Sequence, residues 1–285
     1  MDERTVVAWD GTESANAALT WALNRERRRN GTLTLVRVID DTTVSSDYLT
    51  TASSVESEKT DLDVVVERVR ADDPHIAIDP VLVRGDPGER IRRFSRADTL
   101  VVVGARGPAE SGRAHRWSIG SKLAANIGGP IAIIPVPTRQ VGTGVVVGID
   151  GSAASEAAIR FALAEAALLD QPLTAVHAWE APPIWQDAYV PNEALFQSLE
   201  ESHQLLLDEA TREGVTLNPD LVVHQKLARG AAPRVLVRAA RDASLLVVGN
   251  HGYRGLKRVL LGSVSHAVVL NVEIPTIVVR EPGTT

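Results

Sequence analysis

The chain of 285 residues contains no cysteine, which excludes disulfide bonds and thiolate metal sites and suits a reducing cytosol. It has no N-terminal apolar run like that of a signal peptide, and no run long enough to span a membrane. Basic residues are not in excess, because the formal net charge is -6. These absences predict a cytoplasmic protein that neither enters a membrane nor takes nucleic acid as its main partner.

Two common nucleotide-binding motifs are also missing. The sequence has no Gly-x-x-x-x-Gly-Lys-[Ser/Thr], which disfavours a P-loop NTPase. The glycine fingerprint of a dinucleotide-binding domain follows the first strand, whereas the glycine-rich loops here follow the fourth predicted strands. The seven histidines are scattered without metal-ligand spacing, so we expect no metal site built by the protein alone. The basic run 25–29 is interpreted as the solvated end of a helix.

What the chain does contain is one pattern, present twice. Val6–Gly11 matches Val146–Gly151 at an offset of 140 residues, and Arg84-Gly85 matches Arg229-Gly230 at an offset of 145. The change of offset indicates a short insertion in the second copy. A stretch rich in proline and glycine, 135–144, separates the copies. We therefore predict two domains, residues 1–139 and 140–285, each close to the usual size of a domain.

Each copy alternates short apolar runs with helical patterns. In the second copy the predicted strands are 145–149, 173–178, 221–224, 245–248 and 276–279, and the predicted helices are 153–169, 192–213, 233–241 and 263–271. Ser152 is the expected N-cap of the first helix. Apolar strands between helices predict a parallel sheet covered on both faces. The fold class is therefore α/β, with two tandem doubly wound, Rossmann-like domains, each an open five-stranded parallel sheet.

The most informative motif follows the fourth predicted strand of the second copy. Gly249-Asn250-His251-Gly252 is followed, after nine residues, by Gly262-Ser263, which opens the next helix. Glycines let backbone N–H groups approach an anion, and a helix N-terminus adds free N–H groups and a favourable dipole. The spacing predicts a cradle for phosphate oxygens at the carboxyl ends of the strands, where doubly wound sheets bind ligands.

Together with Asp150-Gly151-Ser152 and Val264-Ser265-His266-Ala267-Val268, this motif resembles the universal stress protein family over essentially the whole chain. The resemblance implies ATP bound between strands one and four, often with Mg²⁺ or Mn²⁺. It implies a stress-responsive regulator with weak or absent hydrolysis, at most a weak ATPase. It also implies pairing through the fifth strands, 131–136 and 276–279. The two halves would then form an internal pseudo-dimer, and the whole chain a homodimer.

The resemblance also implies which residues of the second half hold the nucleotide. Asp150 would lie near the ribose and phosphates, Ala178 beside the adenine, and Arg254 would add charge near the phosphates. The full expected set is Asp150, Gly151, Ser152, Ala178, Val248, Gly249, Gly252, Arg254, Gly262, Ser263, Val264 and Ser265. No catalytic residue and no metal ligand is expected among the protein's side chains.

The first half departs from the family pattern. Asp10, Val38, Gly104 and Gly107 have their counterparts, but twelve residues separate Gly107 from Gly120-Ser121. An ungapped alignment at offset 145 instead puts Trp117-Ser118 opposite Gly262-Ser263. One alignment lengthens the loop, and the other puts an indole where backbone should meet phosphate. Both stay open, and we expect the second half to bind ATP more tightly than the first.

Several alternatives remain at this stage. Asp10 and Asp150 are either metal-binding or catalytic carboxylates or simply helix caps, and an Asp that contacts a ligand can also cap. Trp179, with Trp185 and Tyr189, either covers the sheet edge and the cleft, or forms an aromatic wall over a bound base or a contact with a partner. The protein is an ATP-binding regulator, a nucleotide-independent interaction or scaffold protein of the same fold, or an enzyme of adenylate chemistry. The intact Gly-Ser motif favours the first, and the lack of an evident base or nucleophile speaks against the third.

Overall fold

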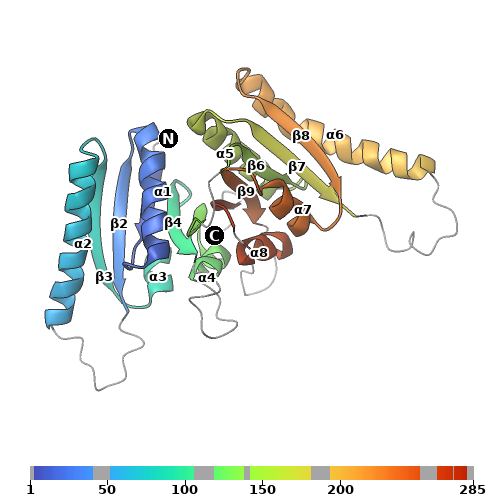
Figure 1. The fold of residues 1–285 in the computed structure, drawn as a ribbon. Coiled ribbons are helices and arrows are strands. Elements are labelled where there is room, and N and C mark those ends of the chain that lie inside the picture. The colour runs from blue at the N-terminus through green and yellow to red at the C-terminus, as the bar shows by residue number, and fades with distance from the viewer. Residues whose placement is uncertain are drawn as a thin grey trace. The chain divides into compact units, whose positions relative to one another are not determined.

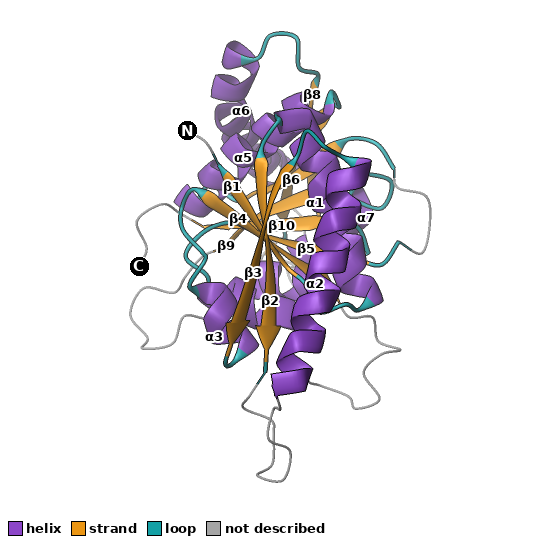
Figure 2. Cartoon of the chain, turned by 90° about the vertical axis from the view of Figure 1, so that its left-hand side faces the viewer, coloured by secondary structure: helices purple, strands orange, loops and turns teal. Residues whose placement is uncertain are grey.

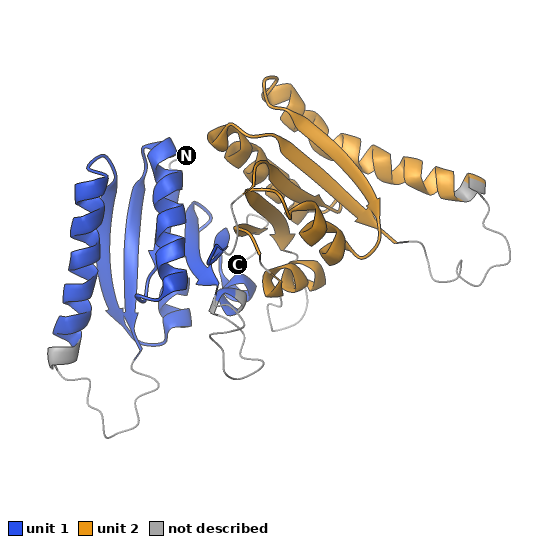
Figure 3. Cartoon of the chain, in the orientation of Figure 1, with its two compact units in different colours: residues 1–138, 257–260, 285 blue, residues 139–256, 261–284 orange. Residues whose placement is uncertain are grey.

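The structure, a computed structural model, describes residues 3–40, 52–105, 119–137, 142–180, 193–250, 262–271 and 273–280. The described residues form two compact units, one up to residue 137 and the other from residue 142 onward (Figure 3). No helix within these ranges is long and apolar enough to cross a membrane. Each unit is described by itself below.

Both units alternate strands and helices in the same order (Figure 1). The first unit contains β1 (Arg4–Ala8), α1 (Glu13–Arg29), β2 (Thr32–Ile39), α2 (Ala52–Asp72), β3 (Ala77–Arg84), α3 (Pro87–Arg92), β4 (Thr99–Ala105), α4 (Ile119–Asn126) and β5 (Ile131–Pro135). The second contains β6 (Val145–Ile149), α5 (Ala153–Leu169), β7 (Leu173–Trp179), α6 (Glu193–Leu217), β8 (Val223–Arg229), α7 (Ala232–Ala239), β9 (Leu245–Asn250), α8 (Ser263–Leu270) and β10 (Thr276–Arg280).

The strands of each unit form a parallel, doubly wound sheet. The order is β3-β2-β1-β4-β5 in the first unit and β8-β7-β6-β9-β10 in the second, and the neighbours within each unit run parallel. Helices cover both faces, as Figure 2 shows for α2 and α3 on opposite sides of β2 and β3. In the second unit α5 contacts α6, and α7 contacts α8. The predicted fold class is confirmed, and the winding direction reverses between β1 and β4 and between β6 and β9.

The first helix of each unit begins and ends by the same device. Thr12 and Ser152 accept hydrogen bonds from the backbone N–H of Ala15 and of Ser155, as N-cap side chains do. At the other end Asn30 and Asp170 adopt left-handed conformations, with φ of 51° and 53°. The predicted cap at Ser152 is therefore confirmed.

Glycine is required where the fourth strand of each unit meets that helix. A Cβ on Gly249 would lie 2.7 Å from the backbone carbonyl carbon of Ala154, and one on Gly104 would lie 2.4 Å from that of Ser14. No side chain fits at these distances. The first turns of α1 and α5 therefore lie directly against the ends of β4 and β9.

The third strand of the second unit was placed wrongly from the sequence. The predicted range was 221–224, whereas β8 spans Val223–Arg229. The physical reason is that β8 ends its unit's strand order, with exposed polar side chains at His224, Gln225 and Lys226. Such a strand lacks the apolar run that marks the central strands.

The basic run at the end of α1 is only partly a solvated helix end. Arg27 and Arg28 are exposed, but Arg25 is only 4% exposed and Glu26 is fully buried. Arg25 donates to Glu26 at 3.1 Å and to Glu3 at 2.7 Å. The charges are tolerated inside because they are paired.

The two predicted fifth strands are present as β5 and β10, and each ends the strand order of its own unit. Both are apolar and largely buried along their length. Their pairing as an internal pseudo-dimer, and the homodimer of the whole chain, stay predictions.

Candidate functional site

A cleft of about 460 Å³ opens in the second unit where the winding direction reverses. Pockets of this size and position commonly hold small ligands in α/β sheets. Its wall is formed by the ends of β6, β7 and β9 and the starts of α5, α7 and α8. The lining residues are Gly148, Ile149, Asp150, Ser155, Val176, Ala178, Ala232, Leu236, Val248, Gly249, Gly262, Ser263, Val264 and Ser265.

Most of the residues predicted for the second half come together in this cleft. Those that line it are Asp150, Ala178, Val248, Gly249, Gly262, Ser263, Val264 and Ser265. Gly151 and Ser152 are not part of the lining, and they form the turn into α5 beside it. Gly252 and Arg254 lie outside the described residues. The structure thus brings into one cleft residues that are more than 100 positions apart in the sequence, such as Asp150 and Gly262.

Asp150 does shape the start of α5. Its Oδ1 accepts hydrogen bonds from the backbone N–H of Ser152 at 3.1 Å and from the Ser152 hydroxyl at 2.5 Å. Ser152 Oγ in turn accepts from the N–H of Ser155 at 3.1 Å. Because Asp150 also lines the cleft, the two interpretations of this residue are compatible: it braces the cap and presents a carboxylate to the cleft.

The N-terminus of α8 differs from those of α1 and α5, because its N-cap residue provides no side-chain cap for the first turn. Gly262 occupies the N-cap position and has no side chain to accept a hydrogen bond. The first N–H groups of a helix have no partner within the helix. At α8 the residues that carry them line the cleft, which makes this end of the cleft a site for an anion.

Asn250 holds this helix start in place and was missed from the sequence. The side chain is 2% exposed, and its Oδ1 accepts from the backbone N–H of Gly262 at 3.1 Å and from the Ser265 hydroxyl at 3.5 Å. Asn250 therefore ties the end of β9 to the first turn of α8. At offset 145 its counterpart is Ala105, which has no such acceptor.

The opposite end of the cleft is apolar. Val176 and Ala178 lie on the same face of β7, and Ala232 and Leu236 come from α7. A Cβ on Gly148 would lie 3.0 Å from Leu236 Cδ1, so glycine there preserves the space. Sequence reasoning identified only Ala178. The alternation along β7 could have revealed Val176, but the packing of α7 could not be deduced from local pattern.

The first unit repeats part of this arrangement. Asp10 Oδ1 accepts from the N–H of Thr12 at 3.1 Å and from its hydroxyl at 2.5 Å, as Asp150 does from Ser152. Val38 lies near the end of β2 and Gly104 near the end of β4. Gly107, Trp117 and Ser118 lie outside the described residues, as does the side chain of Ser121.

Burial in α4 favours the ungapped alignment of the two halves. Gly120 is buried, like Ser265, and Leu123 at 2% exposure matches Val268 at 1%. Each pair is separated by 145 residues. This alignment places Trp117, not Gly120, opposite Gly262.

The aromatic side chain predicted beside the cleft has a different position. Trp179 is buried, stacks on His203 of α6 with ring centroids 4.9 Å apart, and is not part of the cleft lining. Trp179 therefore covers the sheet, as one interpretation expected, but it does not line the cleft. Trp185 and Tyr189 lie outside the described residues.

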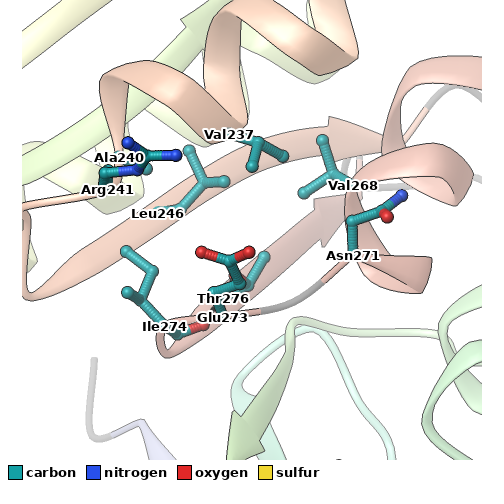
Figure 4. Close-up of a pocket in the computed structure, with 9 residues that line it drawn as sticks. All are labelled: Val237, Ala240, Arg241, Leu246, Val268, Asn271, Glu273, Ile274 and Thr276. Atoms are coloured by element: carbon teal, nitrogen blue, oxygen red, sulfur yellow. Dashed lines mark hydrogen bonds between the residues drawn. The ribbon is translucent and has the colours of Figure 1, made fainter. Parts of the chain in front are cut away.

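A second, much smaller cavity lies between α7, α8, β9 and β10 (Figure 4). Its volume is about 10 Å³, which corresponds to roughly one water molecule. Arg241 and Glu273 contribute to its wall, but the space cannot hold a nucleotide.

Both halves of the chain are similar to proteins of one family. The model of the universal stress protein family matches residues 1–135 and 143–280. Universal stress protein Rv2005c of Mycobacterium tuberculosis (strain ATCC 25618 / H37Rv) is 30% identical over 289 residues, covering 97% of this chain and 96% of that protein. Universal stress protein Rv1996 of the same strain is 29% identical over 302 residues, covering 97% and 95%.

A solved structure supports the fold. The crystal structure of a universal stress protein from Archaeoglobus fulgidus DSM 4304 covers 100% of this chain and 98% of its own, with a TM-score of 0.71 and 16% sequence identity. At that identity the likeness supports the architecture alone.

The hydrogen bond between Asn250 and the N–H of Gly262 can be tested directly by mutation. In Asn250→Ala the N–H of Gly262 loses its acceptor, so we expect faster amide exchange at Gly262 and a loss of about 1 kcal/mol in the free energy of unfolding. Asn250→Asp retains an acceptor oxygen, so exchange at Gly262 should stay close to that of the parent protein, while the buried carboxylate lowers the free energy of unfolding. Hydrogen exchange and urea unfolding provide the measurements. Unaltered exchange at Gly262 in Asn250→Ala would contradict the assignment.

Proposed function

The chain belongs to the universal stress protein family as a tandem of two domains, and we propose that its second domain binds ATP in the cleft between β6 and β9. The observation that carries the proposal is the uncapped N-terminus of α8 at one end of a cleft whose other end is apolar. We propose a regulatory role in the stress response, in the cytoplasm, in which occupancy of the cleft changes contacts with a partner.

The phosphates belong at the α8 end. Gly249 and Gly262 have no Cβ to block the approach of an anion, and the N–H groups of Ser263 and Val264 lie in the first turn of the helix. A helix N-terminus attracts phosphate through these free N–H groups and the helix dipole. The hydroxyls of Ser263 and Ser265 add further hydrogen-bonding groups.

The adenine belongs at the apolar end. Val176, Ala178 and Leu236 offer a surface suited to a flat base, and the small side chain of Ala178 leaves room beside β7. Asp150 lies at the end of β6, within the same lining, where its carboxylate can accept hydrogen bonds from ribose hydroxyls.

A divalent cation would come with the nucleotide. No group of three or more His, Cys, Asp or Glu side chains able to hold a metal ion occurs among the described residues. Mg²⁺ is commonly held by phosphates together with one or two carboxylates, and the cleft supplies Asp150. When bound, the ion would neutralise phosphate charge.

We propose binding with little or no hydrolysis. Among the described residues that line the cleft, Asp150 alone has an ionisable side chain. Its Oδ1 already accepts two hydrogen bonds from Ser152, so it is held as a structural acceptor. A general base must reach the attacking water and have a pKa near the working pH.

The first domain fits the alternative role, a nucleotide-independent interaction surface. Ala105 replaces Asn250, and in the alignment favoured by α4 the indole of Trp117 replaces Gly262. Neither replacement supports a phosphate cradle at the start of α4.

The phosphate cradle predicts the effect of a charge at its centre. Gly262→Asp places a carboxylate against the phosphates, and opposing like charges cost several kcal/mol. We expect ATP affinity at the tighter site to fall at least about 100-fold in calorimetry. Gly128→Asp, where a Cβ would meet only ordinary contacts at 3.7 Å, is the control and should bind normally. Unchanged affinity in a folded Gly262→Asp protein would remove the proposal.

The difference between the halves predicts unequal sites. Asp150→Ala should weaken the tighter site, and Asp10→Ala should leave it intact, since the two residues make matching hydrogen bonds in different domains. ATP titrations of both proteins distinguish the sites, with turnover measured in parallel. Two equal sites would refute the asymmetry, and turnover near the enzyme median of roughly 10 per second would refute the regulatory role.

A further inference from the structure

Two histidines form a hydrogen-bonded chain from α6 to the edge of the cleft. His177 of β7 is 5% exposed, and its Nδ1 lies 2.7 Å from the backbone carbonyl oxygen of Ile149. Its Nε2 lies 2.8 Å from Nδ1 of His203 on α6. Since α6 lies along β7 and β8 (Figure 1), the chain fastens this helix to the end of β6.

The partners determine where the protons are. A carbonyl oxygen can only accept, so Nδ1 of His177 carries a proton. In the neutral ring Nε2 is then an acceptor, so Nδ1 of His203 must donate to it. Nε2 of His203 is the position where one further proton can be added without breaking either bond. A second additional proton could bind only at Nε2 of His177, and it would break the hydrogen bond between the two rings.

The pair lies against an aromatic ring. The ring of Trp179 stacks on His203 at an interplanar angle of 22°. Among the described residues, Arg229 of β8 has its Cζ 5.2 Å from the centroid of Trp179. Asp150 directly follows Ile149 in the sequence, and Glu200 lies one turn before His203 on α6. Burial lowers the pKa of His203 below its ordinary value, and the electrostatic interaction with the neighbouring ring of His177 lowers it further.

The first domain has an ion pair in the same place. Arg37 lies 140 residues before His177, and Glu58 lies 145 residues before His203. The helix alignment is supported by Leu62 and Leu207, which are both fully buried. Arg37 of β2 forms a salt bridge with Glu58 of α2. This pair contains no imidazole, the side chain whose charge ordinarily changes between about pH 5 and 8.

We propose that the hydrogen bond between His177 and His203, which fastens α6 to β6, is broken by protonation, so that mild acid weakens the nucleotide site of the second domain. The first domain is insensitive to mild acid. The effect on nucleotide rests on the proposed function, because Ile149, which accepts the bond from His177, lines the proposed ATP cleft. The effect of acid on the stability of the second domain does not depend on nucleotide binding.

The direction of the pH dependence follows from the number of protons that each state of the pair binds. The fastened pair accepts one additional proton, whereas the two separated rings accept two. His203 also has a lowered pKa in the folded chain, so the released state binds more protons in acid. The stabilisation is therefore fully present above about pH 6.5 and is lost as pH falls below that value. While His203 stays neutral in the fastened pair, the released state binds up to two more protons, and the limit is about 100-fold per pH unit. Once His203 is protonated, the surplus is one proton and the limit is about tenfold per pH unit.

The test compares the full-length protein with two variants between about pH 7.5 and 5. His203→Gln keeps an N–H donor towards His177 but cannot titrate. His177→Arg/His203→Glu transplants the pair of the first domain. The phosphates of ATP titrate in the same range, and this effect is common to all three proteins. His203→Gln retains only the titration of His177, a surplus of one proton in the released state. We therefore expect ATP affinity, measured by calorimetry, to fall with acid more steeply in the parent protein than in either variant, by up to about a further tenfold per pH unit relative to His203→Gln.

Urea unfolding without nucleotide over the same pH range provides the second measurement. A steeper loss of stability in the parent protein than in His203→Gln supports the fastening even if ATP does not bind, which separates this inference from the proposed function. Equal pH profiles of stability in the three proteins overturn it. An ATP affinity that rises in acid more steeply in the parent than in the variants overturns the proposed direction.

Discussion

The contact between Gly249 and the first turn of α5 is the constraint on which the second domain's cleft depends. The strand end and the helix backbone approach so closely that even a Cβ would lie 2.7 Å from a backbone atom. This contact fixes the end of β9 against the start of α5, beside Asp150 and Ser155. The cleft opens just beyond, where the winding direction reverses between β6 and β9. Gly104 and Ser14 repeat the contact in the first domain.

The two domains therefore share a scaffold and differ in what they place on it. Asn250 ties β9 to α8 in the second domain, and Ala105 has no side chain to do so in the first. The second strand and the second helix of each domain are joined by a pair of side chains. The pair is two histidines in the second domain and an arginine with a glutamate in the first. A shared fold with different side chains at the strand ends is typical of proteins in which the fold is kept and the functional sites differ.

Much of this architecture could be predicted from the sequence. The central strands are apolar runs, and the bounds of α5 follow from its cap at Ser152 and its helical pattern. The glycine motif predicted the α8 end of the cleft. The rest depends on tertiary contacts: Leu236 reaches the cleft from α7, Asn250 bonds to a residue twelve positions away, and His177 meets His203 across two elements. The strand β8 was misplaced because its exposed side chains are polar.

The nucleotide content of the purified protein tests the central claim most directly. The full-length chain, prepared without added ligand, would be denatured and its supernatant examined by absorbance and mass, and ATP would then be titrated into nucleotide-free protein. The account predicts an adenine nucleotide released from the protein, or saturable ATP binding dominated by one tight site per chain. A protein that carries no nucleotide and gives no binding signal with ATP, with or without Mg²⁺, would contradict it.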